Sequence, residues 1–342
     1  MKAKILTILT LFLLVSCASS SGSSSDTTSS SSSTTTTTTS SCSGSTSNQT
    51  ACGTSASSAT ISVTGATLSG TTGCITNVNT VISSDLPSWA TDNFKCQVAY
   101  TSGSNYIFKS VNLPNHNSFY WCSAHSSGAT SCPVGNRNST LYEALPGTNY
   151  AAGTNVIGSQ NLIYTIPATP TLATGTLTST QGGLVAIGIT ANGLAIFNNA
   201  AAPPDNLSTE ASTFDNYGGH PTNVSVYHHH AAVNKLSSSM ADSTLIGVAL
   251  DGYLIYAEKC DNGTVSTADD FTPTANTNTA PTTATGLTGN SATTLDELHG
   301  HTTTTRHLST ATYHYHYAQD PTATIKTIMG SYFRGTIGSV SN

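Results

Sequence analysis

The sequence predicts a mainly β protein, in which an internally duplicated β-hairpin module builds a sandwich- or barrel-like domain with long loops. From residue 59 onward, short apolar stretches alternate with Gly, Asn, Thr and Pro clusters, and no long segment has the 3.6-residue period of a helix. Two segments, 184–230 and 243–316, carry the same motifs in the same order. The second copy holds an extra low-complexity stretch, 261–291, which we expect to be a surface insertion.

The individual strands are predicted from local composition. Residues 61–68 and 98–111 are rich in Val, Ile, Thr and Tyr, which favours strands. Each copy begins with a hairpin signature: Asn192-Gly193 and Asp251-Gly252 are flanked by apolar residues, as in two-residue turns with positive φ. We therefore expect a strand, a tight turn and a strand at the start of each copy.

The N-terminus has the features of an exported bacterial lipoprotein. Lys2 and Lys4 precede an apolar run that ends in Leu-Val-Ser-Cys, which predicts a signal peptide over 1–16 and a lipid on Cys17. An ordinary secretory signal cut nearby is the alternative, and the run is too short to span a bilayer comfortably. The Ser/Thr-rich residues 17–58 would form a disordered tether. Ala18 after the cysteine favours the outer membrane or cell surface of the envelope over inner-membrane retention.

We divide the remaining chain into a β-rich N-terminal part, 59–108, and a main domain, 109–342. The formal net charge is −6 and no basic patch is present, which argues against nucleic-acid binding. Lipidation of Cys17 would leave seven of the eight cysteines. An exported chain can keep disulfides, and although the sequence does not encode their connectivity, we take Cys122 with Cys132, which flank a short polar segment, as one pair and Cys74 with Cys96 as the second. Cys260 stands alone within the duplicated region.

Histidines dominate the duplicated motifs. Each copy supplies a Gly-His followed by a Tyr-His-x-His. On a strand, residues two apart face the same side with Cα atoms roughly 6.5 Å apart, so both histidines of a His-x-His can share one metal ion. The Gly-His histidine is the natural third ligand, either in two separate sites or in one site between the copies. The six candidate ligands are His220, His228, His230, His301, His314 and His316.

These motifs resemble the bacterial YHYH domain family, named for its Tyr-His-Tyr-His sequence. Residues 313–316 match that sequence, whereas 227–230 depart from it at His229. The resemblance runs from about 109 to 335 and includes Leu-Pro-Asn-His at 113–116 and Tyr-Phe-Arg-Gly at 332–335. Leu298 and Ser331 stand where the family often has cysteines, so a disulfide at that place is missing. The resemblance implies an exported, histidine-rich β domain and no particular activity.

The ligand type indicates which metal the histidines would bind. Sites made of imidazoles suit copper, zinc, nickel and iron, and we expect copper or zinc, in that order. Asp215 and Asp296, five residues before each Gly-His, can orient the histidines by accepting a hydrogen bond from the ring nitrogen that does not bind the metal, or can instead form turns by bonding their own backbone. The alternative for the whole cluster is a set of structural histidines without metal.

The leading functional interpretation is a cell-envelope lipoprotein that binds a transition metal. A metal-dependent hydrolase, lyase or oxidoreductase with a three-histidine site is the alternative, with Asp215, Asp296 or Glu297 as the general base. A surface adhesion or carbohydrate-binding module is a further alternative, suggested by the long tether. Apart from the membrane and the metal ion, the sequence indicates no partner.

Overall fold

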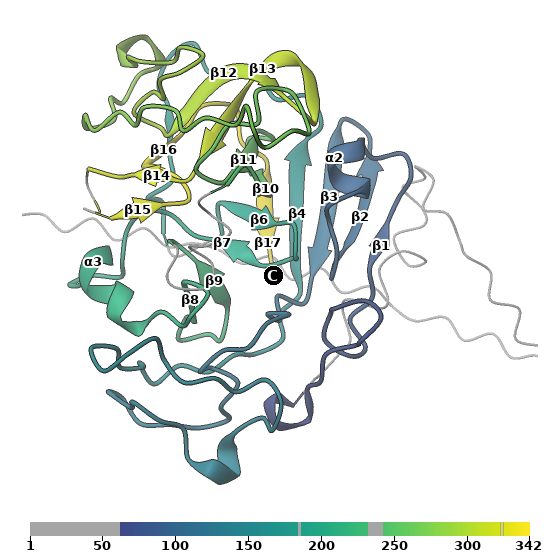
Figure 1. Cartoon of the computed structure of the whole chain (residues 1–342), viewed down its shortest axis with the longest axis vertical. Helices are drawn as coiled ribbons and strands as arrows, with labels where there is room; N and C mark the ends of the chain where they lie inside the picture. The colour runs from purple at the N-terminus through teal and green to yellow at the C-terminus, as the bar shows by residue number, and fades with distance from the viewer. Residues whose placement is uncertain (1–61, 184–185, 232–241, 322, 324) are drawn as a thin grey trace, which may run out of the picture. The chain divides into compact units, whose positions relative to one another are not determined.

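The structure is a computed structural model, and it describes residues 62–342 except 184–185, 232–241, 322 and 324 (Figure 1). The signal peptide, Cys17 and the tether lie outside the described residues. Within the described part of the chain, no helix combines the length and the apolar character needed to cross a membrane.

A five-stranded sheet contains the first strands of the described chain. Its strands, in spatial order, are β1 (Val81–Ile82), β2 (Val98–Ser102), β3 (Asn105–Ser110), β4 (Leu162–Pro167) and β17 (Ser339–Ser341). β2 and β3 form an antiparallel hairpin that turns at Gly103, where φ is +58°. The prediction of strands over 98–111 is therefore confirmed. The prediction of a strand over 61–68 is wrong for the residues described there, because Val63–Gly65 form a 3-10 turn.

The duplication is visible in a second, eight-stranded sheet with the order β12-β13-β11-β10-β6-β7-β9-β8. The first copy supplies β6 (Gly188–Thr190), β7 (Ala195–Ile196), β8 (Gly219–Pro221) and β9 (Tyr227–His229). The second copy supplies β10 (Leu245–Ala249), β11 (Leu254–Tyr256), β12 (Gly300–Thr305) and β13 (Leu308–His316). β6 pairs antiparallel with β10 at the centre. β7 with β9 and β11 with β13 are the equivalent parallel pairs on either side. The two copies are therefore related by a pseudo-twofold arrangement.

Both hairpin predictions are confirmed, but the turn type is different. In the first copy, the N–H of Gly193 donates to Thr190 O, and the N–H of Thr190 donates to Leu194 O, which makes a three-residue loop. In these two loops the positive φ falls on the glycines, +78° at Gly193 and +86° at Gly252, and not on Asn192 or Asp251. Such a loop is a turn followed by a glycine bulge, which the same Asn-Gly or Asp-Gly pair accommodates.

The two sheets share one hydrophobic core, which makes the architecture sandwich-like. Phe108 and Tyr164 of the five-stranded sheet belong to the same buried cluster as Ile189, Ile196 and Val248 of the eight-stranded sheet. Figure 1 shows β4 and β17 beside β10 and β6. The strands of the described residues close no barrel, so a mainly β, sandwich-like fold is confirmed.

The remaining elements are short. Two strand pairs are β14 (Ala318–Gln319) with β15 (Lys326–Thr327), and β5 (Thr178–Ser179) with β16 (Tyr332–Phe333). The helices are α2 (Ser88–Thr91) and α3 (Leu207–Glu210), and the 3-10 turns besides η1 (Val63–Gly65) are η2 (Val134–Asn136), η3 (Ala211–Thr213) and η4 (Ala284–Gly286). The expected insertion, 261–291, lies between β11 and β12 and most of its residues are exposed.

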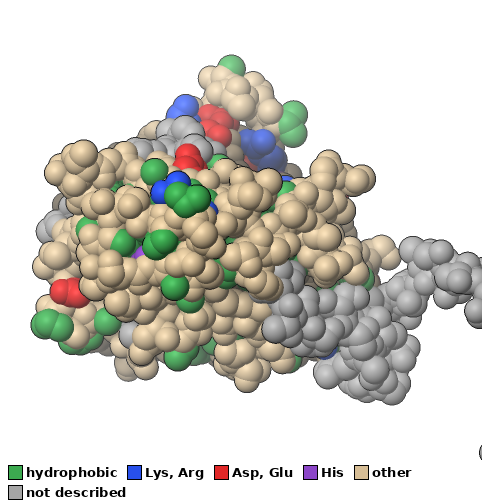
Figure 2. Space-filling view, turned by 90° about the horizontal axis from the view of Figure 1, so that it is seen from below, with side chains coloured by type: hydrophobic (Ala, Val, Ile, Leu, Met, Phe, Trp, Pro, Cys, Tyr) green, Lys and Arg blue, Asp and Glu red, His purple; other side chains and the backbone are tan. Residues whose placement is uncertain are grey.

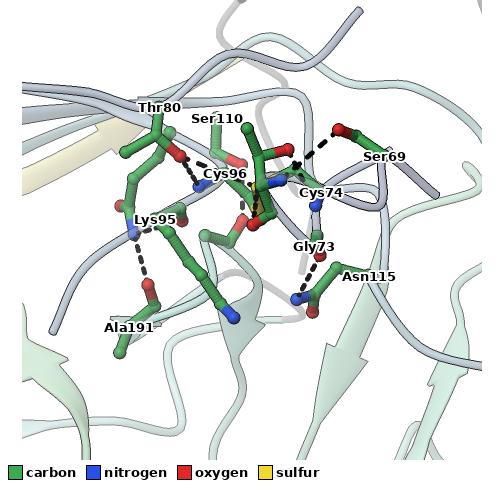
Figure 3. Close-up of a disulfide and its surroundings, with 12 residues drawn as sticks. Ser69, Gly73, Cys74, Thr80, Lys95, Cys96, Ser110, Asn115 and Ala191 are labelled. Atoms are coloured by element: carbon green, nitrogen blue, oxygen red, sulfur yellow. Dashed lines mark hydrogen bonds between the residues drawn. A yellow bond between two sulfur atoms is a disulfide. The ribbon is translucent and has the colours of Figure 1, made fainter. Parts of the chain in front are cut away.

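Two disulfides fix the N-terminal part of the fold. Cys74 pairs with Cys96, and Cys122 pairs with Cys132, which are the two pairs expected above. Figure 3 shows the first of them beside Lys95, whose backbone N–H donates to Ala191 O at 2.8 Å. The disulfide thus ties the segment around Cys74 to the residues before β2, and the Lys95 hydrogen bond joins those residues to the first hairpin of the duplicated region. A domain boundary at 108 would cut β3, which pairs with β4, so segments 59–108 and 109–342 share one sheet.

Candidate metal-binding site

The strand register gathers the six candidate histidines into two groups. His220 lies directly opposite His228 in the β8–β9 pair, and His301 lies opposite His314 in the β12–β13 pair. The second histidine of each His-x-His shares the face of the first because strand side chains alternate. We call the group of His220, His228 and His230 cluster 1, and the group of His301, His314 and His316 cluster 2. Within each cluster the potential ligand atoms lie within 4.8 Å of one another.

The clusters are separate sites and not one site between the copies. β8 and β9 end one edge of the eight-stranded sheet, whereas β12 and β13 end the opposite edge (Figure 1). The pseudo-twofold arrangement therefore separates the clusters, and each is built within its own copy.

The glycine and tyrosine of each motif form the scaffold beside the histidines. A Cβ added at Gly300 would overlap the ring and hydroxyl of Tyr313, and one at Gly219 would overlap those of Tyr227. The Tyr313 hydroxyl in turn donates to Asp296 at 2.9 Å. A glycine is therefore required before His220 and before His301, so that the tyrosine of the neighbouring strand can pass across it.

The same contacts decide between the two roles predicted for Asp215 and Asp296. Asp215 accepts the Tyr227 hydroxyl at 2.7 Å and the Ser118 hydroxyl at 2.5 Å, and it also accepts backbone N–H groups of its own turn. Asp296 accepts Tyr313 and the backbone N–H groups of Leu298 and Gly300. Neither carboxylate bonds a cluster histidine. They are turn-forming groups because the Asx-type bonds to their own backbone fix them there.

Backbone carbonyls orient the histidines of cluster 2. The Nδ1 atoms of His314, His316 and His301 lie 2.9, 2.8 and 3.2 Å from the carbonyl oxygens of Thr312, Ala257 and Ser291. A carbonyl oxygen is an acceptor, so each contact assigns the proton to Nδ1 and leaves a lone pair on Nε2. The Nε2 atoms of His301 and His314 then face each other at 3.1 Å.

Cluster 1 repeats this arrangement. The Nδ1 atoms of His228 and His230 lie 3.0 and 2.5 Å from Val226 O and Asn198 O. The Nδ1 of His220 lies 2.7 Å from the Thr213 hydroxyl, whose own proton goes to Glu210 O. The Nε2 atoms of His228 and His230 face each other at 2.9 Å. All six cluster histidines therefore direct an Nε2 lone pair toward the centre of their cluster.

Burial keeps these imidazoles neutral. It lowers the pKa of His230 to about 4 and that of His314 to about 3. It also lowers the pKa of His228 and His316 well below the usual value, with neighbouring histidines adding to the effect. A neutral imidazole is the form that binds a metal. On the face drawn in Figure 2, histidine is barely visible at the surface.

Cys260 is a neighbour of cluster 2 that the sequence did not suggest. Its thiol joins His301, His314 and His316 in a group whose ligand atoms all lie within 4.8 Å, and it is 1% exposed. Cys260 is a free cysteine. Cys260 pairs with Phe271 in an isolated β-bridge at the start of the insertion. No local spacing in the sequence predicts that the thiol lies beside cluster 2.

Glu210 is the carboxylate beside cluster 1. Its Oε1 lies 3.7 Å from His220 Nε2, and burial, with Asp205 as a second cause, raises its pKa to about 7. Glu210 and the three histidines of cluster 1 line a cavity of about 230 Å³. Glu297, the third carboxylate predicted as a base, instead accepts the backbone N–H of Thr288 at 2.8 Å and its hydroxyl. The base candidate is therefore corrected from Asp215, Asp296 or Glu297 to Glu210.

Two of the other histidines, His229 and His299, lie outside both clusters. His229, at the place where the motif departs from Tyr-His-Tyr-His, faces away from cluster 1 and lies near His116, with ring centroids 6.0 Å apart. Its counterpart Tyr315 donates a hydrogen bond to Asp251 at 2.7 Å. His299 lies 3.5 Å from a carboxylate oxygen of Asp320.

Fold and site together define a mainly β protein with two buried histidine clusters that could hold metal ions. Residues 163–330 match the family model described as YHYH protein, which is the family that the sequence motifs resemble. The match is shorter than the expected 109–335 and covers both copies of the duplicated module. No curated protein and no solved structure matches the chain significantly.

Proposed function

We propose that this protein binds transition-metal ions, copper or zinc, at cluster 1 and cluster 2. The supporting observation is the pair of opposed Nε2 atoms in each cluster, 2.9 Å apart in one and 3.1 Å in the other. Because every Nδ1 proton is committed elsewhere, no proton lies between these lone pairs, and buried lone pairs that face each other are unfavourable. A cation between them removes that conflict.

The distances suit a first-row metal ion. Tetrahedral nitrogen ligands at about 2.0 to 2.1 Å from zinc are roughly 3.4 Å from one another. Small rotations of the imidazoles would open the observed spacings to that value. The carbonyl acceptors on Nδ1 supply the support that metal-bound histidines need, because they hold the ring and raise the basicity of Nε2.

Metal analysis of the purified protein tests the proposal. After loading with copper or zinc and removal of free metal, we expect two ions per chain by elemental analysis. His228→Ala with His230→Ala should remove one ion, and His314→Ala with His316→Ala should remove the other. His125→Ala, outside both clusters, is the control. Wild-type protein that retains no metal after loading, or metal binding that is unchanged after all four replacements, would refute the proposal.

A metal-dependent enzyme is the second candidate, and the cavity beside cluster 1 is the observation that favours it. An ion held by three histidines, with one coordination position free, can lower the pKa of a bound water to about 7. Glu210 is near enough to accept a proton from that water. Zinc-loaded protein would be assayed with chromogenic esters and phosphoesters. Glu210→Gln should keep the metal and lose the turnover, and equal turnover in both proteins would argue against this role.

We also propose that the protein is a lipoprotein of the bacterial cell envelope, anchored through Cys17. The motif around Cys17 and the following Ser/Thr-rich segment support this address. Metabolic labelling with a radioactive fatty acid should mark the wild-type protein and not Cys17→Ser. Label that survives in Cys17→Ser would contradict the assignment.

A further inference from the structure

The two clusters differ in whether a fourth potential protein ligand lies beside the three histidines. Counted from the aligned aromatic residues Phe197 and Tyr256, the position of Cys260 in the second copy corresponds to Ala201 in the first. Cluster 2 therefore has a thiol among its ligand atoms, and cluster 1 has none. Cluster 1 instead borders the cavity of about 230 Å³, which is lined by all three of its histidines.

From this difference we propose that the duplicated sites have diverged into a closed and an open metal centre. Cluster 2 with Cys260 holds its ion through four protein ligands, and cluster 1 leaves one coordination position for a small exogenous anion or neutral donor. This inference rests on the proposed metal binding and adds the ligand set of each centre.

Burial supports the closed centre. Cys260, His301, His314 and His316 are each at most 1% exposed, and His316 Nε2 has no hydrogen-bond partner among the described residues. Four ligands of the Cys and His type are the usual set of a closed structural site, whereas three protein ligands leave a position for water or substrate. Binding at cluster 2 would convert the Cys260 thiol into a metal-bound thiolate and release one proton.

Polar atoms without partners support the open centre. His220 Nε2 and Glu210 Oε2 are buried without a hydrogen-bond partner in the described chain, and both residues line the cavity. His220 is 8% exposed, which is more than the exposure of any of the four residues of the closed centre. A small ligand bound to an ion at cluster 1 would lie in the cavity and bring a hydrogen-bonding atom to Glu210.

Cobalt(II) distinguishes the two centres because its absorption spectrum reports its ligands. The protein would be loaded with cobalt, and the spectrum recorded with and without azide as the anion probe. We expect a sulfur-to-cobalt charge-transfer band in the near ultraviolet, which Cys260→Ser abolishes and His125→Ala preserves. We expect azide to change the visible bands of wild-type protein.

Variants that retain one centre complete the test. With cluster 1 removed by His228→Ala and His230→Ala, the charge-transfer band should remain and azide should have no effect. With cluster 2 removed by His314→Ala and His316→Ala, the band should vanish and the azide response should remain. Circular dichroism checks that each variant is folded.

The outcomes separate this inference from the proposed function. Cobalt bound at both clusters without a charge-transfer band, or an azide response from cluster 2, overturns the inference and leaves metal binding intact. Absence of any bound cobalt overturns both.

Discussion

Replacing Gly300 by alanine should destabilise the protein strongly, although it adds a single methyl group. The new Cβ would overlap the Tyr313 hydroxyl and the adjacent ring carbon. Tyr313 is 2% exposed and donates to Asp296 at 2.9 Å, so it has little room to move. Overpacking of a tight core costs about 1 to 3 kcal/mol. Loss of a hydrogen bond to a charged group costs about 1.5 to 3 kcal/mol more.

We therefore expect the free energy of unfolding to fall by about 2.5 to 6 kcal/mol, a large part of the stability of an ordinary domain. Denaturant unfolding of the metal-free protein, followed by tryptophan fluorescence, measures it. Gly147→Ala is the matched control, because no atom lies within 4 Å of its added Cβ. In a Tyr313→Ala background, Gly300→Ala should cost much less, since the overlapping ring is gone. A Gly300→Ala protein within 0.5 kcal/mol of wild type would refute the reasoning.

Three further predictions concern the charged groups and the disulfides. Acidification of the metal-free protein from pH 6.5 to 4 should lower its stability, because burial holds the pKa of His230 near 4 and that of His314 near 3, so the unfolded chain binds more protons in this window. Buried carboxyls such as Asp296, whose pKa burial raises to about 6, offset part of this loss, and a denaturation midpoint that rises on acidification would contradict the prediction. Arg306→Met should cost about 1.5 to 3 kcal/mol in denaturant unfolding, because it removes the charged hydrogen bond 2.8 Å long to the buried Asp261, which keeps two backbone N–H donors, and an unchanged stability would argue against that pair. The double variant Cys74→Ala with Cys96→Ala should lose about 3 kcal/mol of unfolding free energy, because the disulfide closes a loop with a sequence separation of 22. Under reducing conditions the double variant and the wild type should be equally stable, and a difference there would argue against this cause.

Local patterns in the sequence predicted the hairpins and the direction of the histidines. Alternation of side chains along a strand is a property of two or three residues, so His-x-His was enough to place His314 and His316 on one face. The Asn-Gly and Asp-Gly pairs located both turns, although the detailed loop type differed, because a bulge and a tight turn use the same residues. The strand at 61–68 was wrong because composition alone does not supply a neighbouring strand to pair with.

The sequence by itself determined that the chain contains two copies of one module, each with three histidines suited to a metal ion. Only the tertiary structure decided that the copies keep their clusters apart, since that depends on β6 and β10 meeting at the centre of the sheet. It also decided the neighbours of each cluster: Cys260 at one and Glu210 with a cavity at the other. Such contacts join residues far apart along the chain, and no sequence period encodes them. The role of Asp215 and Asp296 could not be predicted for the same reason. An aspartate can accept hydrogen bonds from its own turn or from a distant histidine, and here the position of a tyrosine hydroxyl decided between these partners.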